Sequence, residues 1–355
     1  MQRDLELATH LDRLGYDEFW CGEHHSSGWE TIASPEMFLA CAGQLTNTIR
    51  LGTGVVSLPY HHPFNVAQRI VQLDHMTRGR AMFGSGPGAL PSDARTFGID
   101  PVLLRDRQDE ALGVIIRLLR GEPRFSYACD WFELHDCELQ LLPIQEDMPM
   151  VTASSISPSG MQLAGKYGMG VLSIASHSTE GILALPTQWG FAEEAATAHG
   201  TTVDRANWRV LMAFHVAETR EQARAEAVDG LHRWHNEYNV WTLGRPGASH
   251  VDDKWVLLDQ STGADATAAG AAVFDGSVTR LRDSQQYLHD NQGDLMAGAS
   301  RAVMAKVMAH EGAAAAMGVT MERLAARRAA SGGARKQSEF RPGAGLAEPP
   351  ETGMD

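Results

Sequence analysis

Apolar and polar positions along the chain alternate between a helical period and short apolar runs typical of buried strands. Apolar residues recur every three or four positions over residues 5–14, and Gly15 follows them as a helix end. The next segment, DEFWCG over residues 17–22, predicts a buried strand. The same exchange of helix and strand then repeats along most of the chain.

The repeated pattern predicts a parallel sheet covered by helices. Further strands are expected over residues 49–58, 80–86, 148–154, 170–175 and 208–217, with a seventh at 302–308. Helices are expected from Ser34, over 63–77, over 102–120, from Pro158 to about Ala198 with a strand between, and up to Tyr238. Residues 123–147 interrupt the alternation as an excursion on the rim, and residues 240–300 are irregular. So many strand–helix units favour closure into a (β/α)₈ barrel over an open doubly wound sheet.

The two ends of the chain depart from a regular barrel. A barrel needs eight strands, yet the chain opens with a helix, so the first strand is expected to be missing. Residues 326–355 are rich in Ala, Gly, Pro and charged residues, which is typical of a disordered tail. We therefore expect one barrel domain over residues 1–325, with an atypical C-terminus, followed by a disordered tail over residues 326–355.

Composition narrows the class of protein. There are 30 Lys and Arg against 44 Asp and Glu, a net charge of −14, which argues against partners such as nucleic acid or anionic membranes. The start lacks the apolar core of a signal peptide, and no apolar run approaches the ~20 residues that span a bilayer. A soluble cytoplasmic protein is expected. Its four cysteines match no metal spacing and are expected to be free buried thiols: Cys21, Cys41, Cys129 and Cys137.

Candidate chemistry lies where predicted strands end, because barrels carry their reacting residues at the carboxyl ends of the strands. Glu23-His24-His25 follows the first predicted strand directly, and a histidine there can act as acid, base or charge partner near neutral pH. A hydrogen-bonded structural pair is the equally weighted alternative. His61 and His62, before the helix at 63–77, are expected to be polar cap residues, and no metal site is expected.

Two further strand ends have unusual compositions. Glycines in the segment Gly52-Thr53-Gly54-Val55 weaken a strand and mark either the close approach of a ligand or a simple bulge. The serine-rich segment 154–160 precedes a helix, where hydroxyls and free N–H groups favour an anion such as a cofactor phosphate over an ordinary N-cap. Together these places predict a phosphorylated cofactor across the barrel mouth, without identifying it.

Four ordered segments carry a resemblance to a known family. They are LDRLGYDEFWCGEHHSSGWETIASPE, IRLGTGVVSLPYHHP, LDHMTRGRAMFGSGPGALPSDA and SPSGMQLAGKYG. Between about residues 3 and 240 the chain closely resembles the flavin-dependent luciferase-like monooxygenases, and it is most similar to those of the limonene 1,2-monooxygenase type. The combination of segments at these intervals is specific, although each alone would be weak.

The resemblance implies a (β/α)₈ barrel and a type of chemistry. It implies that reduced FMN is taken from a separate flavin reductase, reacts with O₂ to a flavin peroxide, and inserts one oxygen atom into a small apolar substrate such as a limonene-like terpene. The flavin carries the oxygen chemistry, while the protein orients it and excludes water. Dimers are common in the family, so a homodimer is expected by analogy.

The resemblance also implies roles for individual residues. His24 matches the first histidine of the Glu-His-His motif and is the implied catalytic residue. Gly54-Val55 matches the position of a cis peptide bond under the flavin ring system. Trp29 and Phe64 are candidate pocket walls, with core packing as the alternative.

Five other residues match cofactor-binding positions of the family. Gly84 and Gly86 match a strand end beside the flavin. Ser157, Ser159 and Gly160 match the phosphate-binding segment.

The chain departs from the family pattern near its C-terminus, and two alternatives stay open. Residues 272–277 stand where the family has a Gly-Thr-Pro-Asp motif, and residues 302–328 have only a faint likeness to its last strand and helix. One alternative is a deazaflavin-dependent oxidoreductase of the same superfamily, which transfers hydride. The other is a truncated barrel without catalysis.

Overall fold

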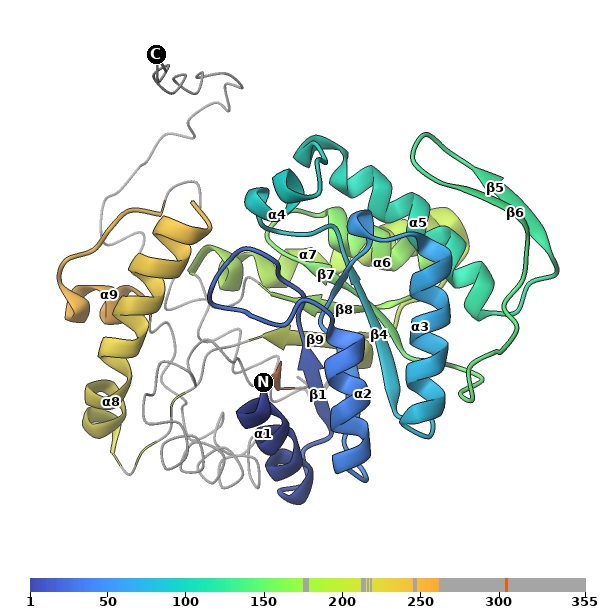
Figure 1. Ribbon diagram of the computed structural model, residues 1–355. Helices are drawn as coiled ribbons and strands as arrows, with labels where there is room; N and C mark the ends of the chain where they lie inside the picture. Colours follow the sequence, from blue (N-terminus) through green and yellow to red (C-terminus); the bar gives the residue numbers. More distant parts are fainter. Residues whose placement is uncertain are drawn as a thin grey trace, which may run out of the picture.

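The computed structural model describes residues 1–174, 179–211, 215, 217, 219–244, 248–261 and 304–305. In this part of the chain a curled sheet is surrounded by helices, as Figure 1 shows. The helices α8 and α9 lie at the left of that view, and the β5–β6 hairpin projects on the right. Among the described residues, no helix combines the length and apolar character needed to cross a bilayer.

The sheet consists almost entirely of parallel strands. Its strands are β1 (Glu18–Cys21), β2 (Arg50–Thr53), β3 (Val56–Ser57), β4 (Ala81–Gly86), β7 (Met150–Ser154), β8 (Gly170–Ser173), β9 (Trp208–Leu211) and β10 (Met304–Ala305). They are hydrogen-bonded in the order β1-β2-β4-β7-β8-β9-β10, and β3 pairs with β4. Only the short β10 runs antiparallel to its neighbour, β9. Because β10 also contacts β1, the sheet curls round toward its own first strand.

Helices follow most of the strands and cover the outside of the sheet. They are α1 (Gln2–Arg13), α2 (Pro35–Leu45), α3 (Pro63–Met76), α4 (Pro91–Thr96), α5 (Leu104–Leu119), α6 (Ser159–Tyr167), α7 (Thr179–His199), α8 (Arg220–Arg233) and α9 (Lys254–Ser261). Three short 3₁₀ segments connect them at Leu58–Tyr60, Pro101–Leu103 and Arg205–Asn207. The segment η4 (Trp234–Thr242) continues α8 as a π-helix.

The main core lies between the sheet and the helices outside it. Phe83 of β4 is fully buried and belongs to one cluster with Ile70 of α3 and Ile115 of α5. On the neighbouring strands, Leu51 of β2 packs in a second cluster with Leu39 of α2. Alternation along each strand directs these large side chains toward the helices, because successive residues of a strand point to opposite faces. The core thus holds the strands in register and fixes where their carboxyl ends lie.

The predicted parallel sheet and its helices are confirmed, with several local corrections. The strand expected over 49–58 is broken after Thr53, and its second part is only β3 and a 3₁₀ turn. The excursion at 123–147 contains an antiparallel hairpin of β5 (Phe125–Ala128) and β6 (Glu133–Cys137). Residues 240–300 are not uniformly irregular, because they include α9.

Some other expectations concern residues that the structure does not describe, and one is wrong in part. The strand expected at 302–308 is described only as Met304–Ala305, and it is antiparallel. Cys21 and Cys137 are buried free thiols, but Cys41 is exposed and Cys129 is half-buried, so the expectation of four buried thiols is wrong. Residues 272–277 and 326–355 lie outside the described residues. The division into a barrel domain and a tail therefore stays a prediction.

Candidate active site

The predicted site residues lie along one edge of the sheet, at the carboxyl ends of adjacent parallel strands. The N–H of Gly54, directly after β2, donates to the Cys21 carbonyl at the end of β1 at 2.6 Å. Ser57 of β3 lies opposite Gly86 at the end of β4. Ser85 pairs in turn with Thr152 of β7. These pairings bring the segments after β1, β2, β4 and β7 to the same face of the barrel.

The backbone between β2 and β3 has a cis peptide bond at Gly54–Val55, as the resemblance implied. The two predicted glycines of β4 leave room for this segment. A β-carbon at Gly84 would overlap the carbonyl oxygen of Thr53, and one at Gly86 would overlap the Val55 side chain. The Thr53 hydroxyl also donates to the Gly84 carbonyl at 2.9 Å and accepts from the Gly84 N–H at 2.8 Å. Close packing thus accounts for both glycines, and a role beside a flavin stays a prediction.

Glu23 is the buried centre of one polar cluster behind this edge. Its side chain is 0% exposed, and its Oε1 accepts hydrogen bonds from Nε2 of His25 at 2.8 Å and of His61 at 2.7 Å. Its Oε2 accepts from the N–H of Ser57 at 2.8 Å. The expected cap positions are confirmed, since His61 ends the 3₁₀ turn and His62 is the N-cap residue of α3. The His61 ring, however, binds Glu23, and the His62 side chain makes no cap hydrogen bond. The cluster ties the loop after β1 to β3 and to the turn that follows it.

The charge state of Glu23 follows from this environment. Burial by itself raises the pKa of Glu23, but the hydrogen bond and charge of His61, together with hydrogen bonds from Ser57 and His25, outweigh that effect and lower it. The net pKa of Glu23 lies below its ordinary value. Glu23 is therefore a carboxylate that anchors two histidines, and its three polar contacts, to His25, His61 and Ser57, serve the loop geometry.

His24 belongs to a second cluster, which is built around the carboxylates of Glu30 and Asp93. Its Nε2 lies 3.0 Å from Oε2 of Glu30, and its Nδ1 lies 3.4 Å from Oδ2 of Asp93. Asp93, on α4, is only 2% exposed and also accepts hydrogen bonds from the N–H of His25 and the hydroxyl of Ser26. The His24 side chain is 16% exposed, so part of its ring reaches solvent.

Two carboxylates favour the protonated form of His24. Burial lowers the pKa of His24, but hydrogen bonding and charge from Glu30 and then Asp93 outweigh that effect and raise it above its ordinary value. A neutral imidazole donates from only one ring nitrogen, so two carboxylate partners are both satisfied only by the imidazolium. His24 can therefore hold a proton near neutral pH and deliver it to an acceptor at the mouth.

The serine-rich segment after β7 forms a compact polar group at the start of α6. The hydroxyls of Ser157 and Ser159 lie 3.0 Å apart, and the Arg105 guanidinium donates to Ser157 at 3.4 Å. Gly160 packs against β7, since a β-carbon there would overlap the Ala153 carbonyl oxygen. Two hydroxyls, a guanidinium and the free N–H groups of a helix N-terminus suit a phosphate. These residues could hold a phosphate, and a role in binding the phosphate of FMN stays a prediction.

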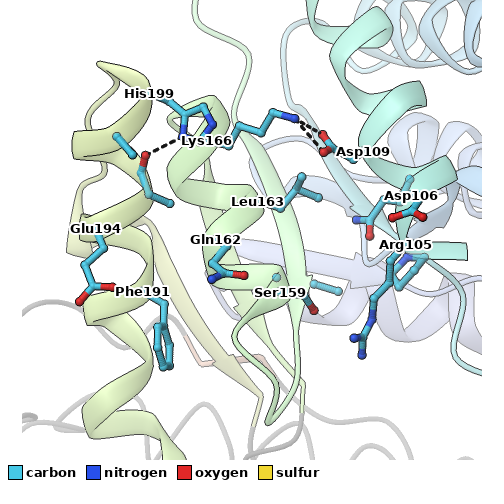
Figure 2. Close-up of a pocket in the computed structure, with 16 residues that line it drawn as sticks. Arg105, Asp106, Asp109, Ser159, Gln162, Leu163, Lys166, Phe191, Glu194 and His199 are labelled. Carbon is cyan, nitrogen blue, oxygen red and sulfur yellow. Dashed lines mark hydrogen bonds and ion pairs between the residues drawn. The ribbon is translucent and has the colours of Figure 1, made fainter.

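A cavity of about 650 Å³ begins beside this group and runs along the outside of α6. Figure 2 shows Arg105 and Ser159 facing each other at one end, while the Lys166–Asp109 ion pair and His199 lie at the other. The cavity lies between α5, α6 and α7, and its lining includes none of residues 23–25. The cavity therefore leads outward from the predicted phosphate-binding residues and is separate from the His24 cluster.

Sequence reasoning found some of these residues and missed others. Trp29 is half-buried with its ring 5.9 Å from that of Tyr238, whereas Phe64 packs against the main core. Asp93, Arg105 and Tyr238 were missed. Asp93 stands in the quoted motif PSDA, which could have flagged it, but no local signal marks the other two.

The family follows from comparison with known proteins. A family model described as luciferase-like monooxygenase matches residues 1–285. The chain belongs to this family. The family resemblance that the sequence suggested is therefore confirmed. Like the family, this luciferase-like monooxygenase is of the flavin-dependent type.

Two curated relatives are similar to this luciferase-like monooxygenase over most of its length. It is 48% identical over 288 residues to 4-hydroxyprotoasukamycin monooxygenase of Streptomyces nodosus subsp. asukaensis, which covers 80% of this chain and 76% of the relative. It is 49% identical over 286 residues to limonene 1,2-monooxygenase of Rhodococcus erythropolis, which covers 81% of this chain and 72% of the relative. The limonene type is thus one of two equally similar relatives.

A solved structure shares the fold. The oxygenating constituent of 3,6-diketocamphane monooxygenase from Pseudomonas putida, in complex with FMN, has a TM-score of 0.60 at 22% identity. The match covers 82% of this chain and 83% of that chain. The barrel architecture predicted from the sequence is confirmed by this likeness.

Proposed function

We propose that this monooxygenase uses reduced FMN, supplied by a separate flavin reductase, to insert one atom of O₂ into a small apolar substrate. The observation that carries the proposal is His24, partly exposed at the carboxyl end of β1 and bound on both ring nitrogens by carboxylates. A protonated, accessible imidazole beside the Gly54–Val55 strand end is suited to proton transfer during oxygen insertion. The FMN complex of a structural relative supports the choice of cofactor.

Each group of site residues has a separate task in this proposal. Bound reduced FMN would supply two electrons, so that one oxygen atom enters the substrate and the other leaves as water. Ser157, Ser159 and Arg105 would hold its phosphate, with Gly160 allowing the close approach of α6. The chain at Gly54–Val55 and Gly86 would border the ring system, and His24 would provide the proton for the departing oxygen.

The substrate class rests on the names of the relatives. One relative at 49% identity is named for limonene, and a more distant one at 28% identity is named for 3,6-diketocamphane, a camphor-type ketone. The relative at 48% identity is named for a different compound, 4-hydroxyprotoasukamycin. Limonene is therefore the first substrate to test, and a small terpene-like molecule is the proposed class.

A single-turnover experiment tests the proposal. The protein is mixed anaerobically with photoreduced FMN, then with O₂ and limonene, and the product is extracted for mass spectrometry. We expect limonene epoxide in an amount that scales with the protein and requires both FMN and O₂. A folded protein that binds FMN but oxygenates neither limonene nor a camphor-type ketone would contradict the substrate class. A protein that reacts only with a reduced deazaflavin would instead support the hydride-transferring alternative.

Three parts of the proposal stay predictions: the reductase partner, the homodimer and the cytoplasmic location. The reductase is testable by its effect on rate, since it must deliver reduced FMN faster than O₂ consumes free flavin. The homodimer is testable by light scattering of the full chain.

A further inference from the structure

A helix from late in the chain contacts the loop that carries His24. Tyr238, on η4, donates a hydrogen bond from its hydroxyl to Oε2 of Glu30 at 2.6 Å. The same carboxylate oxygen lies 3.0 Å from Nε2 of His24. One oxygen atom is therefore shared by the histidine at the barrel mouth and by a tyrosine 208 residues from Glu30 in the sequence. Figure 1 shows the loop between β1 and α2 reaching toward α8 and α9.

Ring contacts place Tyr238 against the loop between β1 and α2. Its ring lies 5.9 Å from that of Trp29 and 6.1 Å from that of Trp234. The Arg233 guanidinium stands 5.6 Å above the Trp29 ring. Such aromatic and cation–π contacts give an orientation as well as burial, so the Tyr238 hydroxyl has a defined position. The segment that carries it is a π-helix, a rare form found disproportionately at functional sites.

The two carboxylates that flank His24 are held in different ways. Asp93 is 2% exposed and is fixed by the N–H of His25 and by the Ser26 hydroxyl. The Glu30 side chain is 41% exposed and has three rotatable bonds, so water and rotamer entropy compete with its bond to His24. Tyr238 supplies an additional hydrogen-bond donor to the Glu30 carboxylate.

We propose that Tyr238 is a positioning residue, which holds the Glu30 carboxylate against His24 and thereby fixes the orientation and protonation of that ring. The inference rests on the proposed function in one respect, namely that His24 handles a proton during oxygenation. The groups that face His24 are Glu30 from its own loop and Asp93 from α4, with Tyr238 acting through Glu30. The cation Arg233 lies over the Trp29 ring, which in turn contacts the Tyr238 ring.

Removal of the Tyr238 hydroxyl distinguishes between two models, in which Glu30 either depends on Tyr238 for its position or stays in place without it. Burial lowers the pKa of His24, and Glu30 is the first of the groups that raise it. If Tyr238 positions Glu30, the variant frees this carboxylate and the pKa of His24 falls. If Glu30 stayed in place without Tyr238, it would be a stronger acceptor, and the pKa of His24 would rise instead. The sign of the change therefore decides between the two models.

The test compares Tyr238→Phe with Tyr127→Phe in the full chain, without cofactor. Tyr127 is a matched control because its ring stacks on Phe132 in the β5–β6 region, away from the barrel mouth. Histidine side chains are labelled with carbon-13 and titrated by NMR, and the His24 signal is assigned from its loss in His24→Gln. We expect His24 to titrate at lower pH in Tyr238→Phe and at the wild-type pH in the control. An unchanged or raised titration would overturn the inference.

A second variant guards against general damage from the first. Glu30→Gln removes the negative charge, but the new side chain can still accept a hydrogen bond from Tyr238. This variant by itself should therefore lower the pKa at which His24 titrates. In that background, adding Tyr238→Phe should have little further effect, because both changes act through one carboxylate. Fully additive effects would mean that Tyr238 acts independently of Glu30, which contradicts the proposal.

Activity supplies an independent readout. We expect kcat of Tyr238→Phe above neutral pH to fall roughly tenfold, less than the loss of a whole acid–base group would cause, because His24 itself is retained. The descending limb of the pH profile should move to lower pH. KM for the substrate should stay unchanged. An unaltered pH profile in an active variant would overturn the positioning role. If Tyr238→Phe shows the NMR effect but the wild type never oxygenates a substrate, the proposed function is overturned and the positioning role stays intact.

Discussion

Arg209 and Glu18 join the first and last long parallel strands of the sheet. Both nitrogen–oxygen distances of this two-pronged ion pair are 2.6 Å, and the two residues are 191 positions apart in the sequence. Their side chains are only 4% and 7% exposed. Arg209 also stands over the Trp20 ring, whose N–H donates to the same Glu18 carboxylate. The pair therefore links β9 to β1 inside the curled sheet.

Loss of one partner of this pair should destabilise the fold strongly. Arg209→Met removes the buried cation that faces the Glu18 carboxylate, and we expect the free energy of unfolding to fall by about 3–5 kcal/mol. Urea denaturation followed by circular dichroism measures this. The exposed pair Arg233–Glu237 provides the control, since Glu237→Gln there should cost less than about 1 kcal/mol. Equal losses from the two variants would show that the strands do not depend on the buried pair.

The pH dependence of stability has a predictable contribution from Asp12. Its carboxylate accepts from the N–H groups of Asn47, Thr48 and Ile49, before β2. Partial burial raises its pKa, but these hydrogen bonds outweigh that effect and lower the pKa to about 2. Because the pKa is depressed on folding, this stabilisation is complete above about pH 4 and is lost as the pH falls through 2.

Asp12→Asn tests this contribution directly. At pH 7 we expect the variant to lose about 1–2 kcal/mol of unfolding free energy, a modest value because the side chain is partly solvated. The difference from the wild type should shrink as the pH approaches 2. Asp147→Asn, on the exposed surface, is the control and should be neutral. A difference that stays constant with pH would argue against the assigned role.

Gly86 is expected to be required by packing even without a cofactor. A methyl group at Gly86 would overlap the Val55 side chain beside the cis peptide bond, so Gly86→Ala should destabilise by about 1–3 kcal/mol. Gly190→Ala is the matched control, because a β-carbon there meets no atom within 4 Å. In the helix α7 it should be neutral or stabilising by up to about 1 kcal/mol. Thermal unfolding of the cofactor-free protein distinguishes the two, and an unaffected Gly86→Ala would mean that Val55 moves aside freely.

The proposed phosphate-binding residues allow the effect of removing one hydroxyl on FMN affinity to be predicted. Ser159→Ala should weaken FMN binding by about 0.5–1.5 kcal/mol, or roughly 2- to 13-fold in Kd, as expected for one hydrogen bond. Ser126→Ala, in the β5–β6 hairpin, should leave Kd unchanged. Isothermal titration calorimetry with FMN and with riboflavin separates phosphate from ring contacts. If Ser159→Ala weakened both ligands equally, the hydroxyl would not be a phosphate ligand.

The elements of this fold were largely predictable because their signals are local. Apolar spacing over residues 5–14 and short apolar runs such as 17–22 predicted a helix and a strand that the structure contains. The break in the strand after Thr53 was harder to predict from the local sequence, because the segment there packs against Gly86 of another strand. The helix α4, which carries Asp93, is only six residues long and produced no clear period.

The candidate site was predictable in place but incomplete in partners. The position of His24 after a strand indicated the barrel mouth, and the family resemblance supplied a role for it. Its partners Glu30 and Asp93 lie 6 and 69 residues away, and Tyr238 lies 208 residues beyond Glu30. Pairings of this kind arise from the closure of the sheet and the seating of η4, which no periodicity of the sequence encodes.

The most direct test of the central claim is a single turnover with ¹⁸O₂, reduced FMN and limonene, in the wild type and in His24→Ala. The account predicts one ¹⁸O atom in the wild-type product and a yield lowered roughly 100-fold in His24→Ala, with FMN binding retained. His135→Ala, whose side chain is 76% exposed, should behave as the wild type. Product without ¹⁸O, or full oxygenation by His24→Ala, would contradict the account.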